Sequence, residues 1–363
     1  MKREHFERLK PVCPRCRRIS GSETPLAIGS VLQGKTGVIT QGILLCSDVQ
    51  CRSEYPIIDG IPIIVDDLRT YVSQNILPVM WRSDLEPEIE SLLGDCCGPS
   101  SAFNAHRQNL SSYTFDHYGD LDPDERDNAP LAPGSILNVA RKSLELAAPV
   151  VNGPILDIGC SVGRTTFELA ACFDELVLGI DLGFDMLRTA ARVLRQGVVS
   201  YPRRRVGMAY DRREFAVEPD GSGRVDFWAC DATAIPFPVS SFSLAASFNV
   251  IDCVGSPLDH LQSIERVLIP GGQALLATPY DWSVTATPVE SWLGGHSQRS
   301  EKNGASETVL KSLLAGGDHP LALKNLRLVK EISDFPWSVR LHDRSCMQYR
   351  SHLVIIESIA DDL

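Results

Sequence analysis

Short apolar runs alternate with amphipathic stretches through the middle of the chain. The runs lie at residues 155–158, 176–180, 225–230 and 242–249. Residues 134–149, before the first run, and residues 164–173, after it, have the spacing of helices. Continuous apolar runs that alternate with helices are typical of buried parallel strands. The pattern therefore predicts an α/β fold built around a mainly parallel sheet.

The C-terminal part adds three more strands. Residues 266–276 predict a helix end, a Pro-Gly-Gly turn and a strand, and residues 326–333 and 353–358 predict an antiparallel pair. With the four runs above, the expected sheet has seven strands. Residues 196–223 form an insertion between the second and third strands, and its basic triplet Arg203–Arg205 is interpreted as solvated surface rather than as a binding site.

The turn after the first strand has the pattern of a nucleotide site. It runs Asp157-x-Gly159-x-x-x-Gly163, from a strand into a helix N-terminus. A dinucleotide loop needs G-x-G-x-x-G around a pyrophosphate, which an acid at position 157 would repel. The acid instead suits the cationic methionine end of S-adenosylmethionine. The order of these residues resembles the first motif of class I methyltransferases.

Later strand ends agree with that resemblance. Asp181 ends the second strand, where its carboxylate can accept from two ribose hydroxyls, and Asp231-Ala232 follow the third strand, where they would meet the adenine edge. The resemblance implies a Rossmann-like methyltransferase fold that binds S-adenosylmethionine. The expected cofactor contacts are Asp157, Gly159, Cys160, Gly163, Asp181, Leu182, Asp231, Ala232 and Asn249.

Composition and charge indicate which partners and which cellular location to expect. The chain has 363 residues, 44% of them hydrophobic, and a net charge of −11, which disfavours a long polyanionic partner. It has no run of about 18 apolar residues and no apolar signal core at its start, so we expect a cytoplasmic protein without a membrane partner. Without an export signal, its 11 cysteines indicate metal ligands and buried thiols before disulfides.

Four of the cysteines have metal-site spacing. Cys13 and Cys16 form one C-x2-C pair, and Cys46 and Cys51 form a looser C-x4-C pair, which together predict a structural zinc site in a zinc ribbon. The alternative is four reduced thiols that hold no metal. Residues 54–65 follow as strand, Asp-Gly turn and strand, and the whole stretch is similar to the zinc-ribbon domain of the small activator subunit of several tRNA and protein methyltransferases.

The expected organisation has three parts. They are a zinc-ribbon-like domain at 1–68, a connector and helical cap at 69–145, and a methyltransferase domain at 146–363. Prolines interrupt the middle part, and its acidic run at 120–127 is interpreted as a solvated connector.

More specific motifs follow the fifth strand. The segments 277–283, 287–295 and 335–340, together with Tyr349, closely resemble the C-terminal methyltransferase domain of ovothiol synthase, the mercaptohistidine N-methyltransferase family. Two upstream segments, 115–120 and 249–252, resemble the leading segment and the fourth-strand signature of the same domain. The resemblance covers roughly residues 113 to 357.

The resemblance implies methyl transfer to an imidazole nitrogen of 5-thiohistidine, or to a closely related small molecule. The sequence lacks the sulfoxide synthase portion that usually precedes this domain, and its eight histidines contain no H-x-x-x-H, so a separate enzyme would supply the thiohistidine. The expected catalytic residues are Asn249, Asp252 and Tyr280. The expected substrate contacts are His117, Tyr118, Tyr280, Trp282, Trp292, Trp337 and Arg340, the last as the partner of a carboxylate.

Each of these residues also has a structural interpretation. Asp252 would cap the following helix, Trp292 and Trp337 would be core aromatics, and Arg340 would pair with a structural acid. Two rival functions stay open. One is an RNA base methyltransferase, because residues 1 to 18 hold seven basic residues against two acids and a zinc ribbon precedes the enzyme domain. The other is an inert scaffold that recruits a partner through the ribbon.

Overall fold

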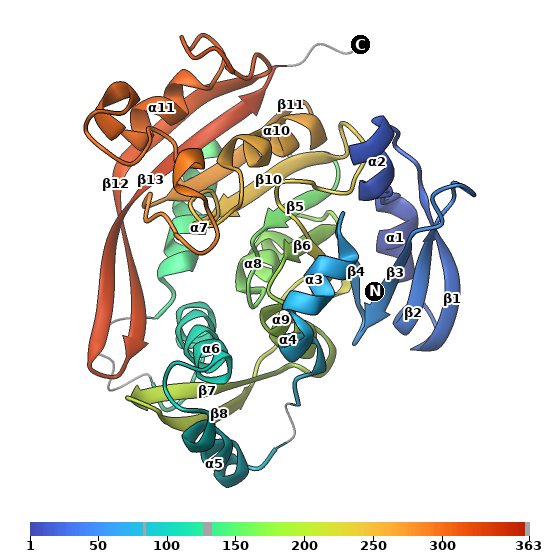
Figure 1. The fold of residues 1–363 in the computed structure, drawn as a ribbon, viewed down its shortest axis with the longest axis vertical. Helices are drawn as coiled ribbons and strands as arrows, with labels where there is room; N and C mark the ends of the chain where they lie inside the picture. The colour runs from blue at the N-terminus through green and yellow to red at the C-terminus, as the bar shows by residue number, and fades with distance from the viewer. Residues whose placement is uncertain (83–84, 126–132, 360–363) are drawn as a thin grey trace.

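One large sheet runs through the molecule (Figure 1). The structure is a computed structural model that describes residues 1–82, 85–125 and 133–359. Within that part of the chain the sheet has eleven strands, in the order β1-β2-β3-β4-β9-β6-β5-β10-β11-β13-β12. The strands are β1 (Leu26–Lys35), β2 (Val38–Cys46), β3 (Glu54–Ile58), β4 (Ile61–Ile64), β5 (Ile155–Ile158), β6 (Val177–Asp181), β9 (Val225–Cys230), β10 (Phe242–Phe248), β11 (Leu268–Thr278), β12 (Leu326–His342) and β13 (Ser345–Ser358).

Seven of these strands confirm the predicted methyltransferase sheet. The strands β9, β6, β5, β10 and β11 pair in parallel, and β13 pairs antiparallel with both β11 and β12. The two C-terminal β runs thus form the predicted antiparallel pair, and β12 lies at the edge of the sheet. The insertion after the second strand forms a separate hairpin of β7 (Val198–Val206) and β8 (Ala209–Ala216).

Helices cover both faces of the sheet. They are α1 (Arg3–Leu9), α2 (Pro14–Ser20), α3 (Leu68–Gln74), α4 (Ile76–Met80), α5 (Pro87–Cys97), α6 (Ala102–Tyr118), α7 (Ser135–Ala147), α8 (Arg164–Cys172), α9 (Phe184–Gln196), α10 (Pro257–Val267) and α11 (Ser306–Ser312), with 3-10 turns η1 (Ser222–Arg224), η2 (Val289–Ser291) and η3 (Glu301–Gly304). Successive strand residues face opposite sides, so on β5 Ile155 packs into one apolar cluster with α7, α8 and α9, and Leu156 into another with α1, α10 and α11. This two-faced burial explains why the strands are continuously apolar.

The cysteine-bearing segment continues the same sheet. Strand β4 pairs in parallel with β9, through Ile63 and Ala229, and the β3–β4 turn has left-handed backbone at Asp59 (φ 52°) and Gly60 (φ 77°). The guanidinium of Arg17 on α2 donates to the carbonyls of the loop after β9. The N-terminal strands are therefore an extension of the methyltransferase sheet, where the sequence predicts a small ribbon beside a seven-stranded sheet.

Two acids of the acidic run are buried, which contradicts their interpretation as part of a solvated connector, whereas Asp124 is exposed. Asp122 is fully buried and pairs with Arg213, and Glu125, 2% exposed at its side chain, pairs with Arg203 at 2.7 Å. Arg203 and Arg205 of the basic triplet both pair with Asp343. Arg205 is 52% exposed, as the interpretation of the triplet as solvated surface predicts, whereas Arg203 is only 21% exposed and departs from it. Opposite charges buried together compensate each other's desolvation. Residues 126 and 127 of the run lie outside the described residues.

No helix in the described parts of the chain combines the length and the apolar character needed to cross a membrane.

Candidate functional site

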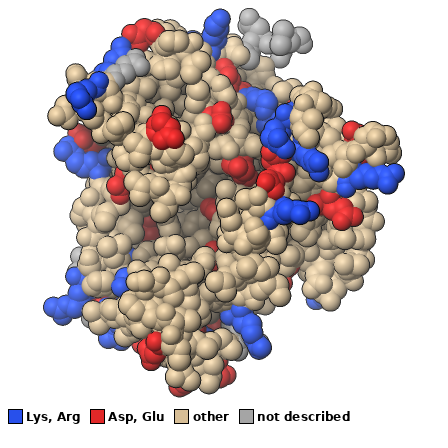
Figure 2. Space-filling view, viewed as in Figure 1, with Lys and Arg blue, Asp and Glu red and all other residues tan. Residues whose placement is uncertain are grey.

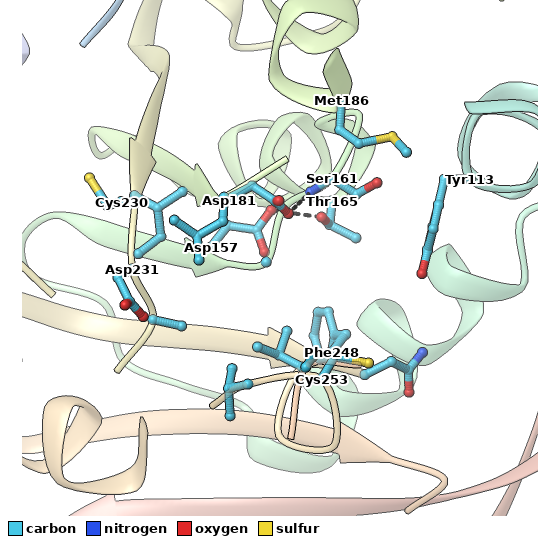
Figure 3. Close-up of a pocket in the computed structure, with 18 of the residues that line it drawn as sticks. Tyr113, Asp157, Ser161, Thr165, Asp181, Met186, Cys230, Asp231, Phe248 and Cys253 are labelled. Carbon is cyan, nitrogen blue, oxygen red and sulfur yellow. Dashed lines mark hydrogen bonds between the residues drawn. The ribbon is translucent and has the colours of Figure 1, made fainter. Parts of the chain in front are cut away.

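A cavity of about 570 Å³ opens at the carboxyl ends of the parallel strands (Figure 3). The expected site residues among its lining are His117, Asp157, Gly159, Asp181, Leu182, Asp231, Ala232, Asn249 and Trp337. Residues that the sequence did not single out also line it, among them Gln74, Tyr113, Asp116, Ser161, Thr165, Met186, Cys253 and Thr285. The cavity lies at the crevice where α/β sheets of this type bind ligands.

Two carboxylates stand at the centre of the cavity (Figure 3). Asp157, at the end of β5, accepts hydrogen bonds on Oδ2 from the Thr165 and Thr166 hydroxyls, at 2.6 and 2.7 Å. Burial raises the pKa of Asp157 to about 6, although the two hydroxyls oppose the shift. Asp181, at the end of β6, accepts the Ser161 N–H at 2.9 Å and the Gly183 N–H at 2.7 Å. These bonds fix the carboxylates and leave each with lone pairs for a ligand.

Two further polar groups are positioned for a ligand. Asp231, after β9, uses Oδ1 to accept from the N–H and hydroxyl of Thr233, both at 2.8 Å. Asn249 follows β10 with left-handed backbone (φ 57°), and neither its amide oxygen nor its amide nitrogen has a hydrogen-bond partner among the described residues, although both atoms are buried. Buried polar groups are rarely left unpaired in a native protein. The Asn249 amide is therefore available for a hydrogen bond with a molecule in the cavity.

Two expected cofactor residues support the turn without lining the cavity. Cys160 is 1% exposed, and burial raises the pKa of its thiol well above the usual value. Gly163 has φ 89°, and a Cβ there would lie 2.6 Å from the Phe227 ring and 2.8 Å from Ala190 Cβ. Gly163 thus permits close packing of α8 on the sheet.

The wall opposite the strand ends comes from α6 and β12. In Figure 3, Tyr113 projects from α6 on the other side of the cavity from Asp231. Trp337 on β12 donates from Nε1 to Asp116 Oδ2 at 3.0 Å. Burial, with a smaller contribution from a nearby guanidinium, lowers the pKa of His117 to about 3, so its ring is neutral at physiological pH. Segments outside the parallel strands therefore complete the cavity.

The charge of the lining is one-sided. Its acids are Asp116, Asp157, Asp181 and Asp231, and none of its described residues is a lysine or arginine. Figure 2 shows a hollow at the centre of one face of the molecule, with acidic side chains at its walls. Such a cavity favours a cationic ligand and disfavours an anionic one.

Three of the expected aromatic substrate contacts do not line the cavity. Tyr280 does not line it, and its hydroxyl donates to His352 Nδ1 at 2.8 Å, since His352 Nε2 donates to Glu331 at 3.0 Å. Trp282 and Trp292 stack on each other, with ring centroids 5.9 Å apart. The structure does not bring these three aromatic rings into contact with the cavity.

Two other expected residues are also set back from the cavity lining. Asp252 is 2% exposed and accepts the Asp281 N–H on Oδ2 at 2.8 Å, while burial raises its pKa to about 6. It lies in the turn after β10 and not at the cap of α10, whose N-terminus Ser256 caps. Tyr118 is 1% exposed and donates to the Val162 carbonyl at 3.0 Å.

Arg340 is held in a buried structural pair. It is 6% exposed, contacts Glu125 at 3.2 Å and lies 3.3 Å from the centroid of the Phe115 ring. The structure gives Arg340 this acidic partner and does not place it in the lining of the cavity, where a substrate carboxylate would be expected. The sequence pattern gives the residue type but cannot reveal that the partner comes from the acidic run.

Arg340→Met is therefore expected to reduce stability rather than acceptor binding. Removing one partner of a buried ion pair costs about 3 kcal/mol when the other charge is left alone. The loss here should be smaller, since Glu125 keeps its pair with Arg203. Urea denaturation measures the loss, with Arg350→Met as control, since the Arg350–Asp334 pair is 74% and 62% exposed and is worth about 0–1 kcal/mol. A variant as stable as the parent, but with a raised KM for the acceptor, would return Arg340 to substrate binding.

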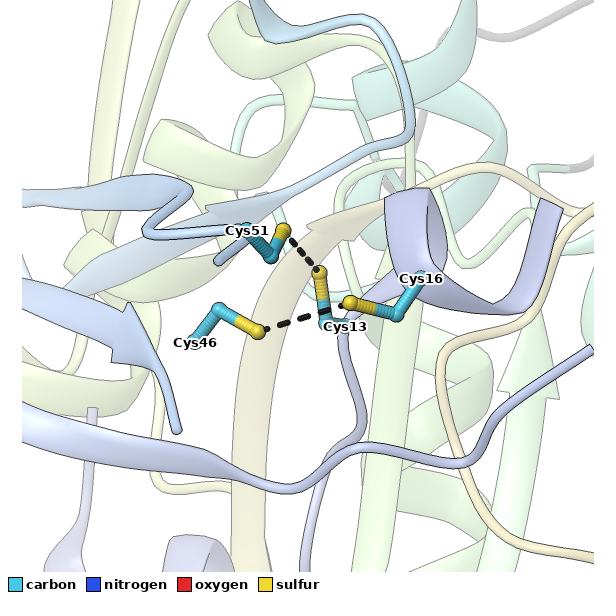
Figure 4. A group of neighbouring side chains, drawn as sticks. All are labelled: Cys13, Cys16, Cys46 and Cys51. Atoms are coloured by element: carbon cyan, nitrogen blue, oxygen red, sulfur yellow. Dashed lines mark hydrogen bonds between the residues drawn. The ribbon is translucent and has the colours of Figure 1, made fainter. Parts of the chain in front are cut away.

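The four predicted ligand cysteines meet in one cluster (Figure 4). Their sulfurs lie within 4.8 Å of one another, with Cys13–Cys51 at 3.8 Å and Cys16–Cys46 at 3.6 Å. Four sulfurs at about 2.3 Å from a tetrahedral zinc are separated by about 3.8 Å. The Tyr55 hydroxyl lies 3.1 Å from the Cys13 sulfur, where it can orient a thiolate. The cluster therefore has the ligands and the approximate spacing of a tetrahedral zinc site.

Comparison with known proteins agrees with the fold. Residues 156–276 match the family model described as methyltransferase domain. With the strand order, this match shows that the chain contains a methyltransferase domain with the class I fold.

Solved structures show weaker likenesses. Phosphoethanolamine N-methyltransferase 2 of Haemonchus contortus, in complex with S-adenosyl-L-methionine, is 26% identical over 39% of this chain and 28% of its own length, with a TM-score of 0.31. The [4+2]-cyclase SpnF is 15% identical over 61% of this chain and 81% of its own, with a TM-score of 0.38. A chain in the complex of the Haloferax volcanii Trm112 methyltransferase activator with a methyltransferase is 15% identical over 61% and 88%, with a TM-score of 0.37. Because these TM-scores lie below 0.5, the assignment rests on the family match and the topology.

Proposed function

We propose that the cavity binds S-adenosylmethionine with its methionine end at Asp157, its ribose at Asp181 and its adenine at Asp231 and Ala232. Three adjacent strands, β5, β6 and β9, end in these carboxylates, in the order in which the parts of one extended adenosyl molecule would follow. Each carboxylate is fixed by short hydrogen bonds and keeps free lone pairs. The observation that carries the proposal is this row of three oriented acids in one cavity.

We further propose that the methyl acceptor is an imidazole nitrogen of 5-thiohistidine or of a closely related small molecule. The resemblance of residues 113 to 357 to the mercaptohistidine methyltransferase family supports this acceptor. The size and charge of the cavity support a small acceptor that turns its amino group and ring towards the acids. Its carboxylate would face away from them.

Methyl transfer requires mainly that the acceptor is positioned correctly relative to the methyl group. Bound S-adenosylmethionine supplies an electrophilic methyl group on a sulfonium. The protein then has to hold a neutral ring nitrogen about 3 Å from that carbon, on the sulfur–methyl axis. The unpaired amide of Asn249 is our candidate for orienting the ring. Asp252 and Tyr280 lie behind the lining, so we assign them support of the wall and no contact with the acceptor.

The rival acceptor is an RNA base. A cleft of about 930 Å³ beside the cysteine cluster contains Arg15, Arg18, Arg52 and Arg69, which favours a polyanion. Three acids, Glu54, Asp66 and Asp67, line the same cleft and nearly balance its charge. An RNA backbone near the cavity would also meet four carboxylates, so we favour the small molecule.

We also propose that the four thiolates hold a structural zinc ion. All four ligands come from the protein, which leaves no position for water or substrate. The ion would hold the start of α2 to the end of β2 and so stabilise the N-terminal extension of the sheet.

Methyl transfer from labelled S-adenosylmethionine tests the function. The purified protein is incubated with 5-thiohistidine, with histidine and with bulk RNA, and label is followed into each acceptor. We expect label in 5-thiohistidine at a rate well above that in histidine and RNA. Label in RNA alone would support the rival, and label in none of them, with S-adenosylhomocysteine still bound, would reject this acceptor class.

A further inference from the structure

Asp116 is a buried carboxylate that the cofactor does not need. It lies in the last turn of α6, 4% exposed, and lines the cavity. Its Oδ2 accepts from Trp337 Nε1 at 3.0 Å, and its Oδ1 accepts from the Ile136 N–H at 3.3 Å. These two neutral donors orient the carboxylate, and each oxygen keeps a lone pair.

No cation compensates this carboxylate within the described residues. The groups that face it are the Trp337 indole from β12, the Ser135 and Ile136 N–H groups from α7, and the Asp120 carboxylate from the loop after α6. Burial raises the pKa of Asp116 to about 6, and Asp120 adds to the shift. A buried, hydrogen-bonded carboxylate without a counter-charge is a ready partner for a cationic ligand group.

The position of Asp116 distinguishes it from the other acids of the cavity. Asp157, Asp181 and Asp231 follow the parallel strands β5, β6 and β9, whereas Asp116 belongs to the opposite wall, with Tyr113 and Trp337. If the three strand-end acids hold the cofactor, Asp116 is the acid left to face the acceptor.

We propose that Asp116, held by Trp337, binds the cationic amino group of the methyl acceptor and so selects small amines and zwitterions with an ammonium group near the reacting ring. The inference rests on the proposed function, because it takes the cavity as the place of methyl transfer. It specifies which group of the acceptor is recognised by the wall that contains Asp116 and Trp337.

Binding of two probes to the protein saturated with S-adenosylhomocysteine tests the proposal by calorimetry. Histamine carries an ammonium group beside its imidazole, and imidazole-4-propionate carries a carboxylate instead. We expect histamine to bind about 10- to 100-fold more tightly than imidazole-4-propionate, as a lost charge-assisted hydrogen bond implies. In Asp116→Asn, which keeps the shape and one acceptor oxygen, the preference should fall to within about threefold. Equal binding of the two probes by the parent, or an unchanged preference in the variant, would overturn the proposal.

Two controls separate this role from a structural one. Asp334→Asn, at a side chain that is 62% exposed, should leave both probes unaffected. Trp337→Phe keeps the charge of Asp116 but removes its indole donor, so the preference for histamine should fall partly while the affinity for S-adenosylhomocysteine stays within about twofold. This variant also serves if Asp116→Asn fails to fold, and full preference in it would count against the positioning role.

Turnover separates this inference from the proposed function. The parent is assayed with 5-thiohistidine and with its des-amino analogue, which keeps the ring, the thiol and the carboxylate. Methylation of both at equal kcat/KM would leave the function standing and reject the role of Asp116. Methylation of neither, with histamine still preferred in binding, would reject the acceptor and leave Asp116 as a cation site.

Discussion

Cys13→Ser is expected to lower the zinc content of the purified protein from about one equivalent towards zero and to destabilise the N-terminal extension of the sheet by several kcal/mol. The reason is that a structural zinc contributes its binding free energy directly to folding. Cys13 is fully buried, and its sulfur lies 3.8 Å from that of Cys51, so a serine there leaves three thiolates around an incomplete site. Metal analysis and thermal denaturation measure the two effects.

The loss should also reach the cofactor site. Strand β4 leads into α3, where the Tyr71 hydroxyl donates to the Leu182 carbonyl at 2.8 Å and Gln74 lines the cavity. We therefore expect weaker binding of S-adenosylhomocysteine in the Cys13→Ser protein. Cys96→Ser, at an exposed cysteine on α5, is the matched control and should change neither property. A full equivalent of zinc in the Cys13→Ser protein would contradict the four-thiolate site.

Asp181→Ala should weaken the binding of S-adenosylhomocysteine by about 1–3 kcal/mol, which is roughly 5- to 150-fold. The variant removes the acceptor for the ribose hydroxyls and also releases the Ser161 and Gly183 N–H groups that shape the turn. Asp181→Asn keeps one acceptor oxygen and should lose less. Isothermal titration measures both affinities.

The control for this variant is an acid before the other end of β6, away from the cavity. Asp174, after α8, has a side chain that is 97% exposed, and Asp174→Ala should bind the ligand as the parent does. An unchanged affinity in Asp181→Ala would show that Asp181 is not the ribose ligand.

The strands of the methyltransferase sheet were predictable because they depend on local periodicity. The parallel strands are buried on both faces, which makes them continuously apolar, and the glycine-spaced turn from Asp157 to Gly163 marks the first crossover. The cysteine spacing likewise predicts a cluster, since a metal site needs two close pairs of ligands. What the sequence could not show is that β4 joins β9, because parallel pairing between distant strands leaves no local pattern.

The cavity wall formed by α6 and β12 was harder to predict for a related reason. Helix α6 contains Asp116 in a segment with little amphipathic character, and its neighbours Trp337 and Arg340 come from a strand more than 200 residues later. Residue type alone favoured Arg340 as a substrate ligand, whereas only the structure reveals its buried partner Glu125. Asp116 was within reach of the sequence, since it adjoins His117 in the segment 115–120.

A crystal structure of the protein with S-adenosylhomocysteine tests the central claim most directly. The account predicts the ribose hydroxyls within hydrogen-bond distance of Asp181, the amino-acid end beside Asp157 and the adenine beside Asp231. An adenosyl group bound outside this cavity, or a cavity closed by its own side chains in the complex, would contradict it.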